Sequence, residues 1–120
     1  MKIRVYQYDQ CGSCKKALRF LLQKGLPFEK LSIVDQPPTL TELQQMLTWQ
    51  QGNVRKLLNT SGKLYQEMEL AKKLPQMETD EVLTLLSRHG KLVKRPFVVL
   101  GSRGLVGFKE SEWREVFKNF

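Results

Sequence analysis

Long hydrophobic runs are absent from this sequence. No apolar stretch approaches the ~18–20 residues that a helix needs to cross a bilayer, so a transmembrane helix is excluded and no membrane partner is expected. The first residues, MKIRVYQYD, also lack the apolar core and the small-residue cleavage site of a secretory signal. We therefore expect the protein to be cytoplasmic.

Cysteine and histidine are scarce, with 2 cysteines and 1 histidine in 120 residues. A closed zinc site needs about four ligands, so one chain cannot complete such a site, although half of a site shared across a dimer stays open. Cytoplasmic thiols are kept reduced, so a permanent structural disulfide is not expected either. Cys11 and Cys14 are therefore predicted to carry redox chemistry, with no metal and no resident cofactor. The alternative is that both are buried apolar fillers.

Acidic residues are fewer than basic ones. The chain has 20 lysines and arginines and 12 aspartates and glutamates, which gives a formal net charge of +8. Two stretches, residues 15–24 and 88–109, contain no acidic residue. This charge favours nucleic acid, a phosphate-like oxyanion or an acidic protein surface as partner, or it serves solubility alone. Direct nucleic-acid binding is not expected, because the second stretch is predicted to form strands and a hairpin rather than a recognition helix.

The chain is predicted to form a single α/β domain, residues 1–120. Alternating apolar residues predict strands over residues 2–8, 28–34, 96–100 and 105–108. Apolar residues at helical spacing predict helices over residues 13–24, 40–49, 53–58, 64–74, 80–88 and 111–117. The order is β-α-β, then a helical insertion at about 39–89, then β-β-α, with boundary errors of ~2–4 residues. A β-α-β unit implies that the first two strands are parallel.

Local signals predict how several helices begin and which face they bury. The side chains expected to cap a following helix are Thr39 or Thr41, Asn53, Thr79 and Ser111. The face of the first helix expected to point inward consists of Ala17, Leu18, Leu21 and Leu22.

The Cys-Gly-Ser-Cys motif is predicted to lie where the first strand ends and the first helix begins. The free N–H groups and the dipole of a helix N-terminus stabilise a thiolate, so we expect the pKa of Cys11 to lie below the free-thiol value of ~8.5. Lys15 and Lys16 add positive potential nearby. Cys14 follows one helical turn later and can close a disulfide. Cys11 is thus predicted to be the attacking thiol and Cys14 the resolving thiol.

Pro96 opens the third predicted strand, one of the few places where a strand accepts proline. In a thioredoxin-like fold this position holds a cis-proline that lies against the cysteine pair. The preceding residue, Arg95, then becomes a candidate site residue. The alternative is that Arg95 is an ordinary surface charge.

Three blocks of the sequence together resemble the arsenate reductase/Spx family of thioredoxin-fold proteins. They are YQYDQCGSCKKAL near the start, NVRKLLNTSGKLYQEM in the middle and LVKRPFVVLGSRGLVGF near the end. The chain looks closest to the arsenate-reductase-like branch that carries CxxC. The resemblance implies a thioredoxin-like fold, in which a four-stranded mixed sheet is flanked by helices and a helical insertion is added.

The resemblance also implies roles for individual residues. Cys11 matches the cysteine that attacks arsenate, and Arg55 and Arg95 match the first two of three arginines that hold the oxyanion. The third arginine falls at Gly107, and those enzymes have serine at Cys14 and arginine at Lys15. The further residues expected to contact the oxyanion or another substrate are Gly12, Ser13 and Lys15. A thiol–disulfide oxidoreductase, supplied with electrons by glutathione, glutaredoxin or thioredoxin, is the leading prediction.

A second branch of the same resemblance implies a regulator instead of an enzyme. In Spx proteins the CxxC motif is a redox switch, and the protein binds the C-terminal domain of the RNA polymerase α-subunit. The basic surface of this chain suits such an acidic protein partner. In either case we expect a monomer.

Overall fold

Side chains along the strands alternate between two layers of helices. The computed structural model describes residues 2–120. The strands are β1 (Arg4–Gln7), β2 (Glu29–Ser32), β3 (Phe97–Val99) and β4 (Gly104–Val106), in the spatial order β2-β1-β3-β4. β1 pairs parallel with β2 and antiparallel with β3, and β3 pairs antiparallel with β4. The predicted four-stranded mixed sheet of a thioredoxin-like fold is confirmed.

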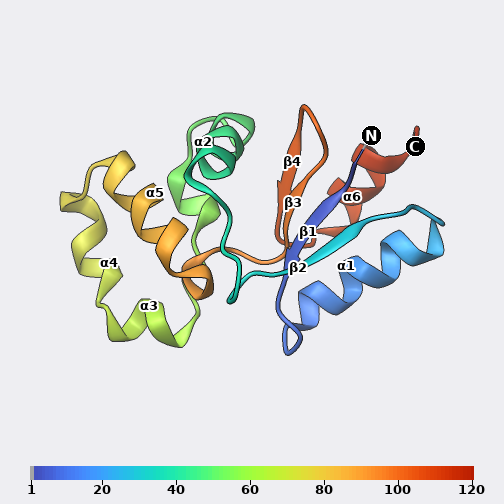
Figure 1. Ribbon diagram of the computed structural model, residues 1–120. Coiled ribbons are helices and arrows are strands. Elements are labelled where there is room, and N and C mark those ends of the chain that lie inside the picture. Colours follow the sequence, from blue (N-terminus) through green and yellow to red (C-terminus); the bar gives the residue numbers. More distant parts are fainter. Residues whose placement is uncertain (1) are drawn as a thin grey trace.

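Two helices, α1 (Gly12–Gln23) and α6 (Glu110–Phe117), cover one face of the sheet (Figure 1). Val5 and Val98 point to this face and pack with Leu21 and Trp113, all of them fully buried. The indole N–H of Trp113 donates to the carbonyl oxygen of Gly107 at 3.1 Å, so burying this large side chain leaves no unpaired donor.

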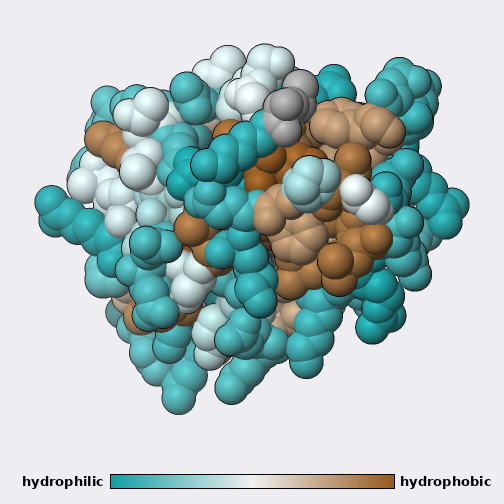
Figure 2. Space-filling model, turned by 45° about the vertical axis from the view of Figure 1, so that its right-hand side comes forward, coloured by the Kyte–Doolittle hydropathy of each residue, from teal (hydrophilic) through white to brown (hydrophobic). Residues whose placement is uncertain are grey.

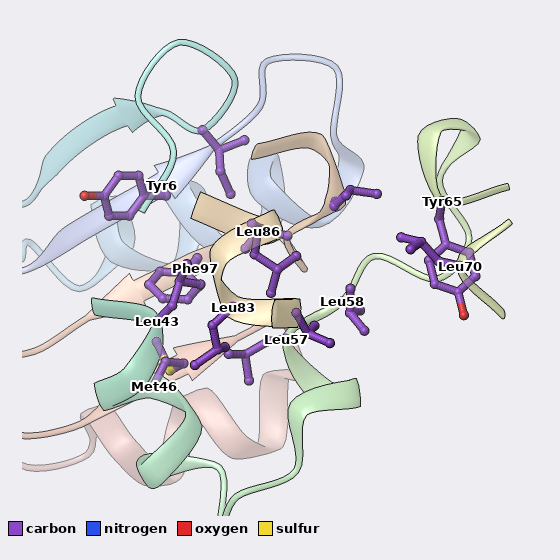
Figure 3. Packing of buried hydrophobic residues seen from close by; sticks show 14 of the residues in the cluster. Tyr6, Leu43, Met46, Leu57, Leu58, Tyr65, Leu70, Leu83, Leu86 and Phe97 are labelled. Atoms are coloured by element: carbon purple, nitrogen blue, oxygen red, sulfur yellow. The ribbon is translucent and has the colours of Figure 1, made fainter. Parts of the chain in front are cut away.

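The other face is covered by α2 (Leu40–Trp49) and α5 (Thr79–Arg88). Tyr6 and Phe97, each one residue away from the valines above, point to this side and meet edge to face with ring centroids 5.8 Å apart. Figure 3 shows them next to leucines of both helices. The remaining short elements are η1 (Val54–Leu57), α3 (Lys63–Glu67), α4 (Leu70–Lys73), η2 (Leu74–Gln76) and η3 (Gly90–Leu92).

The single helix predicted over residues 64–74 is wrong. Glu69 adopts the left-handed conformation with φ of 53°, which ends α3 and starts α4 in a new direction. Tyr65 and Leu70 are nevertheless both buried and adjacent (Figure 3). The break therefore turns two apolar side chains toward the same core, which a straight helix of this length does not do.

Three local predictions about helices also differ from the structure. Glu78, not Thr79, is the N-cap of α5, and its N–H donates to the Glu81 carboxylate at 3.0 Å. α6 begins at Glu110 after Lys109, so Ser111 lies inside the helix and does not cap it. Leu22, predicted to face the core, is 68% exposed, because the buried face of α1 is centred on Ala17 and Leu21 and Leu22 lies about 100° further around the helix than Leu21. Of the two predicted caps of α2, Thr39 and Thr41, Thr39 is the cap in the structure, since its hydroxyl accepts from the N–H of Glu42.

Glu42 ties α2 to the sheet through a nearly buried carboxylate. It accepts hydrogen bonds from the Tyr6 hydroxyl at 2.7 Å and from the Arg4 guanidinium at 2.5 Å. Burial and this hydrogen bond to Glu42 raise the pKa of Tyr6 to about 12. The carboxylate therefore has both a charge partner and a neutral donor, the condition under which a buried charge is tolerated.

Apolar side chains are also exposed at the surface. Figure 2 shows an apolar area, bordered by polar side chains, on the face that carries α1 and α6. A cavity of about 480 Å³ is lined by residues that include Ile3, Pro27 and Phe28. Among residues 2–120, no helix combines the length and the apolarity needed to span a membrane.

Candidate functional site

Cys11 occupies the N-cap of α1, directly after the turn that follows β1. Its sulfur accepts a hydrogen bond from the N–H of Cys14 at 3.4 Å, and its own N–H donates to the carbonyl of Tyr8 at 3.0 Å. The first N–H groups of a helix have no partner within the helix, and here a sulfur atom takes the place of the usual capping oxygen. The helix therefore begins at Gly12, one residue before the predicted start.

The two thiols lie in different environments. Cys14 is fully buried, whereas Cys11 is partly exposed, and both are free. Burial, together with the hydrogen bond and the negative charge of Cys11, raises the pKa of Cys14 to about 12. Burial also opposes ionisation of Cys11, but the hydrogen bonds from Cys14 and the charge of Arg95 outweigh it and lower the pKa of Cys11. Of the two thiols, the partly exposed Cys11 therefore loses its proton at the lower pH.

Arg95 reaches Cys11 because of the strand register. Tyr6 pairs with Phe97 across antiparallel β1 and β3, so the residues that precede Phe97 lie opposite those that follow Tyr6. The Arg95 guanidinium lies over the ring of Tyr8, 4.9 Å from its centroid, and its positive charge is among the causes that lower the pKa of Cys11. The Arg95–Pro96 peptide bond is cis. A cation held on an aromatic face beside the sulfur stabilises the thiolate.

A cavity of about 520 Å³ adjoins the N-terminus of α1, where Ser13 forms part of its wall. Two hydrogen bonds draw its walls together: the Lys94 N–H donates to the carbonyl of Leu57 at 2.8 Å, and the Gly107 N–H donates to the carbonyl of Pro96 at 2.9 Å. η1, the residues before β3 and the end of β4 therefore meet at one place. The basic side chains that line the cavity are Arg55, Lys56, Lys94 and Lys109.

The residues predicted for the site thus fall into two neighbouring groups. The structure brings Cys11, Cys14 and Arg95 together, while Ser13 and Arg55 line the adjacent cavity. The other two predicted contacts, Gly12 and Lys15, are exposed on the first turn of α1.

Sequence reasoning did not assign a role to Tyr8 or Lys94. Tyr8 holds the Arg95 guanidinium, and Lys94 lines the basic cavity. The available signals were the position of Lys94 directly before Arg95-Pro96 and the absence of acidic residues from this stretch. Within residues 2–120 no group of three or more histidine, cysteine or acidic side chains is arranged to hold a metal ion.

Comparison with known proteins places the chain in a family. A model of the ArsC family matches residues 6–116. The chain belongs to the ArsC family. It is 38% identical to YusI of Bacillus subtilis over 115 residues, which cover 96% of this chain and 98% of YusI. The structure of an ArsC family related protein from Bacteroides fragilis, 41% identical, superposes with a TM-score of 0.90 over 97% of this chain and 98% of that one.

The relatives of this chain also include a transcriptional regulator. The global transcriptional regulator Spx of Bacillus subtilis is 26% identical over 112 residues, which cover 93% of this chain and 84% of Spx. The resemblance to the arsenate reductase/Spx family found in the sequence is confirmed.

Replacing Arg95 by glutamine is expected to raise the pKa of Cys11. The thiolate fraction of a thiol increases with pH, so the rate of alkylation by iodoacetamide increases with pH and levels off above the pKa of Cys11. In the wild type this plateau is expected at a lower pH than for a free thiol, and Arg95→Gln is expected to move it upward and slow alkylation at pH 7 by about threefold to tenfold. Lys73→Gln, which removes the same charge on distant α4, is the control, and an equal effect of both variants would exclude a local role of Arg95.

Proposed function

We propose that this member of the ArsC family is a cytoplasmic thiol–disulfide oxidoreductase that uses Cys11 as nucleophile and Cys14 as resolving thiol. The observation that carries the proposal is the contrast between the two sulfur atoms. Cys11 is partly exposed, caps α1 and has a lowered pKa, whereas Cys14 is buried one turn away with its pKa raised to about 12. Stepwise exchange requires an accessible thiol that ionises more readily and a second, protonated thiol close to it, and Cys11 and Cys14 meet these two conditions.

The exchange with a disulfide RS–SR proceeds in two steps. The Cys11 thiolate attacks one sulfur, the S–S bond breaks, and one thiolate RS⁻ leaves, so that Cys11 is held in a mixed disulfide. Cys14 then loses its proton, attacks the Cys11 sulfur and expels the second RS⁻. Overall RS–SR is reduced to two thiols, and Cys11 and Cys14 are oxidised to a disulfide, which an external thiol or redoxin reduces again.

The same local geometry makes the second step easier after the first. The negative charge of the Cys11 thiolate is among the causes that raise the pKa of Cys14. Once Cys11 is covalently bound to RS, this charge has gone and the pKa of Cys14 falls. Cys14 therefore becomes more reactive once there is an adduct to resolve.

The experiment that tests the proposal is a redox titration of Cys11 and Cys14 in glutathione buffers, followed by mass spectrometry. A reversible two-electron couple is expected near the cytosolic glutathione poise of about −220 to −320 mV. Arsenate-dependent oxidation of the same two thiols, with arsenite and water as products, would extend the substrate range to the oxyanion. Failure to form the disulfide at any potential would refute the two-thiol mechanism.

A regulator of the Spx type is the second candidate function, and the similarity to Spx over 93% of this chain favours it. In that case the oxidised or the reduced protein binds the C-terminal domain of the RNA polymerase α-subunit through its basic surface. A binding titration with both redox states separates the two functions. No binding in either state would exclude the regulator.

A further inference from the structure

The basic cavity beside α1 has no part in the exchange step described above. Cys11 and Arg95 do not line it, although Ser13 from the cysteine motif does. Its basic side chains are Arg55, Lys56, Lys94 and Lys109, and one acidic side chain, Glu112, also lines it. The cavity therefore concentrates positive charge a short distance from the reactive sulfur rather than at it.

Lys94 and Arg95 are consecutive in the sequence, but their side chains contact different parts of the site. The Arg95 guanidinium lies over Tyr8 and its charge lowers the pKa of Cys11, whereas the Lys94 side chain lies along Gly107 in the cavity wall. A Cβ atom at Gly107 would lie 3.1 Å from Cε of Lys94, so the missing side chain at Gly107 leaves room for the lysine stem. Arg95 thus acts on the Cys11 sulfur, while the basic side chains of the cavity are placed to bind a negatively charged group of a ligand.

The volume and the lining of the cavity limit which ligands it can bind. A volume of about 520 Å³ lies within the usual range for small-molecule sites, ~300–1,000 Å³. Apolar surface from Leu58, Val106 and Phe108 lines the same cavity and suits a carbon chain. An oxyanion bonded directly to Cys11 would not reach into a cavity that Cys11 does not line. The occupant must therefore carry its reacting sulfur and its negative charge some atoms apart.

We propose that this cavity binds the carboxylate of a small disulfide while Cys11 attacks the sulfur of the same molecule. Arginine and lysine pair strongly with carboxylates, and Arg55 and Lys94 are the two cations we assign to this contact. The proposal rests on the thiol–disulfide exchange of the preceding subsection and adds a substrate class to it. Disulfides that carry carboxylates are selected over neutral disulfides of similar size.

The test compares two aromatic disulfides that react with the reduced protein at pH 7. Dithiobis(2-nitrobenzoate) carries a carboxylate on each ring, and 4,4′-dithiodipyridine is uncharged, and both release a coloured thiol. The second-order rate constant for each probe is measured by stopped flow, and their ratio is compared between wild type and variants. The ratio of carboxylate probe to neutral probe is expected to fall about threefold to tenfold in Lys94→Gln and in Arg55→Gln, and further in the double variant.

The control variant is Lys73→Gln on α4, which changes the net charge equally but lies far from the site (Figure 1). Its ratio is expected to match the wild type, and thermal unfolding of all variants checks that they are folded. If the ratio falls as much in Lys73→Gln, or stays the same in the double variant, the carboxylate site is refuted while the exchange function stands. If neither probe reacts with Cys11 faster than with a free thiol, the exchange function fails and the carboxylate site fails with it.

Discussion

Cys11→Ser is expected to abolish reduction of small disulfides, with the rate falling by at least about a thousandfold. A serine hydroxyl stays protonated at neutral pH, and the remaining thiol, Cys14, is fully buried with its pKa raised to about 12. Neither group can then supply a nucleophile to a disulfide in solvent. Stopped-flow measurement of the coloured thiol released by 4,4′-dithiodipyridine determines the loss.

The matched variant Cys14→Ser is expected to behave differently, because it retains the attacking sulfur. One thiol is released per protein molecule, and the mixed disulfide on Cys11 then persists instead of being resolved. Mass spectrometry of the intact protein detects the trapped adduct, and circular dichroism verifies the fold of both variants. Release of two thiols by Cys14→Ser at the wild-type rate would show that Cys14 is not the resolving thiol.

Gly90→Ala is expected to cost about 3 kcal/mol of the free energy of unfolding. Gly90 begins η3 and is buried against the chain just after β2, where an added Cβ would overlap the carbonyl oxygen of Ile33. This neighbour is backbone and cannot rotate away, so β2 or η3 must shift. A loss of this size lowers the melting temperature by roughly 10 °C in a domain of this length.

Gly12→Ala is the control for the Gly90 substitution. Gly12 is the first residue of α1, and no atom lies within 4 Å of its Cβ position. Its substitution is expected to change stability by less than about 1 kcal/mol, since alanine favours a helix more than glycine does. Calorimetry of both variants measures the difference, and equal melting temperatures would contradict the close approach at Gly90.

Much of the candidate site is predictable because it is built from neighbouring residues. A strand that ends at Gln7, a turn and a helix that begins at Gly12 place two cysteines on one helical turn, and each of these features has a local signal. The position of Arg95 beside Cys11 could not be predicted from local signals. Arg95 lies 84 positions after Cys11 in the chain and reaches it only through the pairing of β1 with β3. The resemblance to a family supplied that contact, since periodicity alone does not show strand register.

The sequence alone determined the elements that depend on local propensity and periodicity, among them the parallel first pair of strands, a threonine cap at Thr39 or Thr41 and the Cys11–Cys14 spacing. Tertiary structure decided the remainder. The break at Glu69 and the exposure of Leu22 depend on which side chains pack into the core. The basic cavity exists only because η1, the residues before β3 and the end of β4 meet there. Such long-range contacts arise from packing and hydrogen bonding between distant segments, for which short sequence patterns carry no signal.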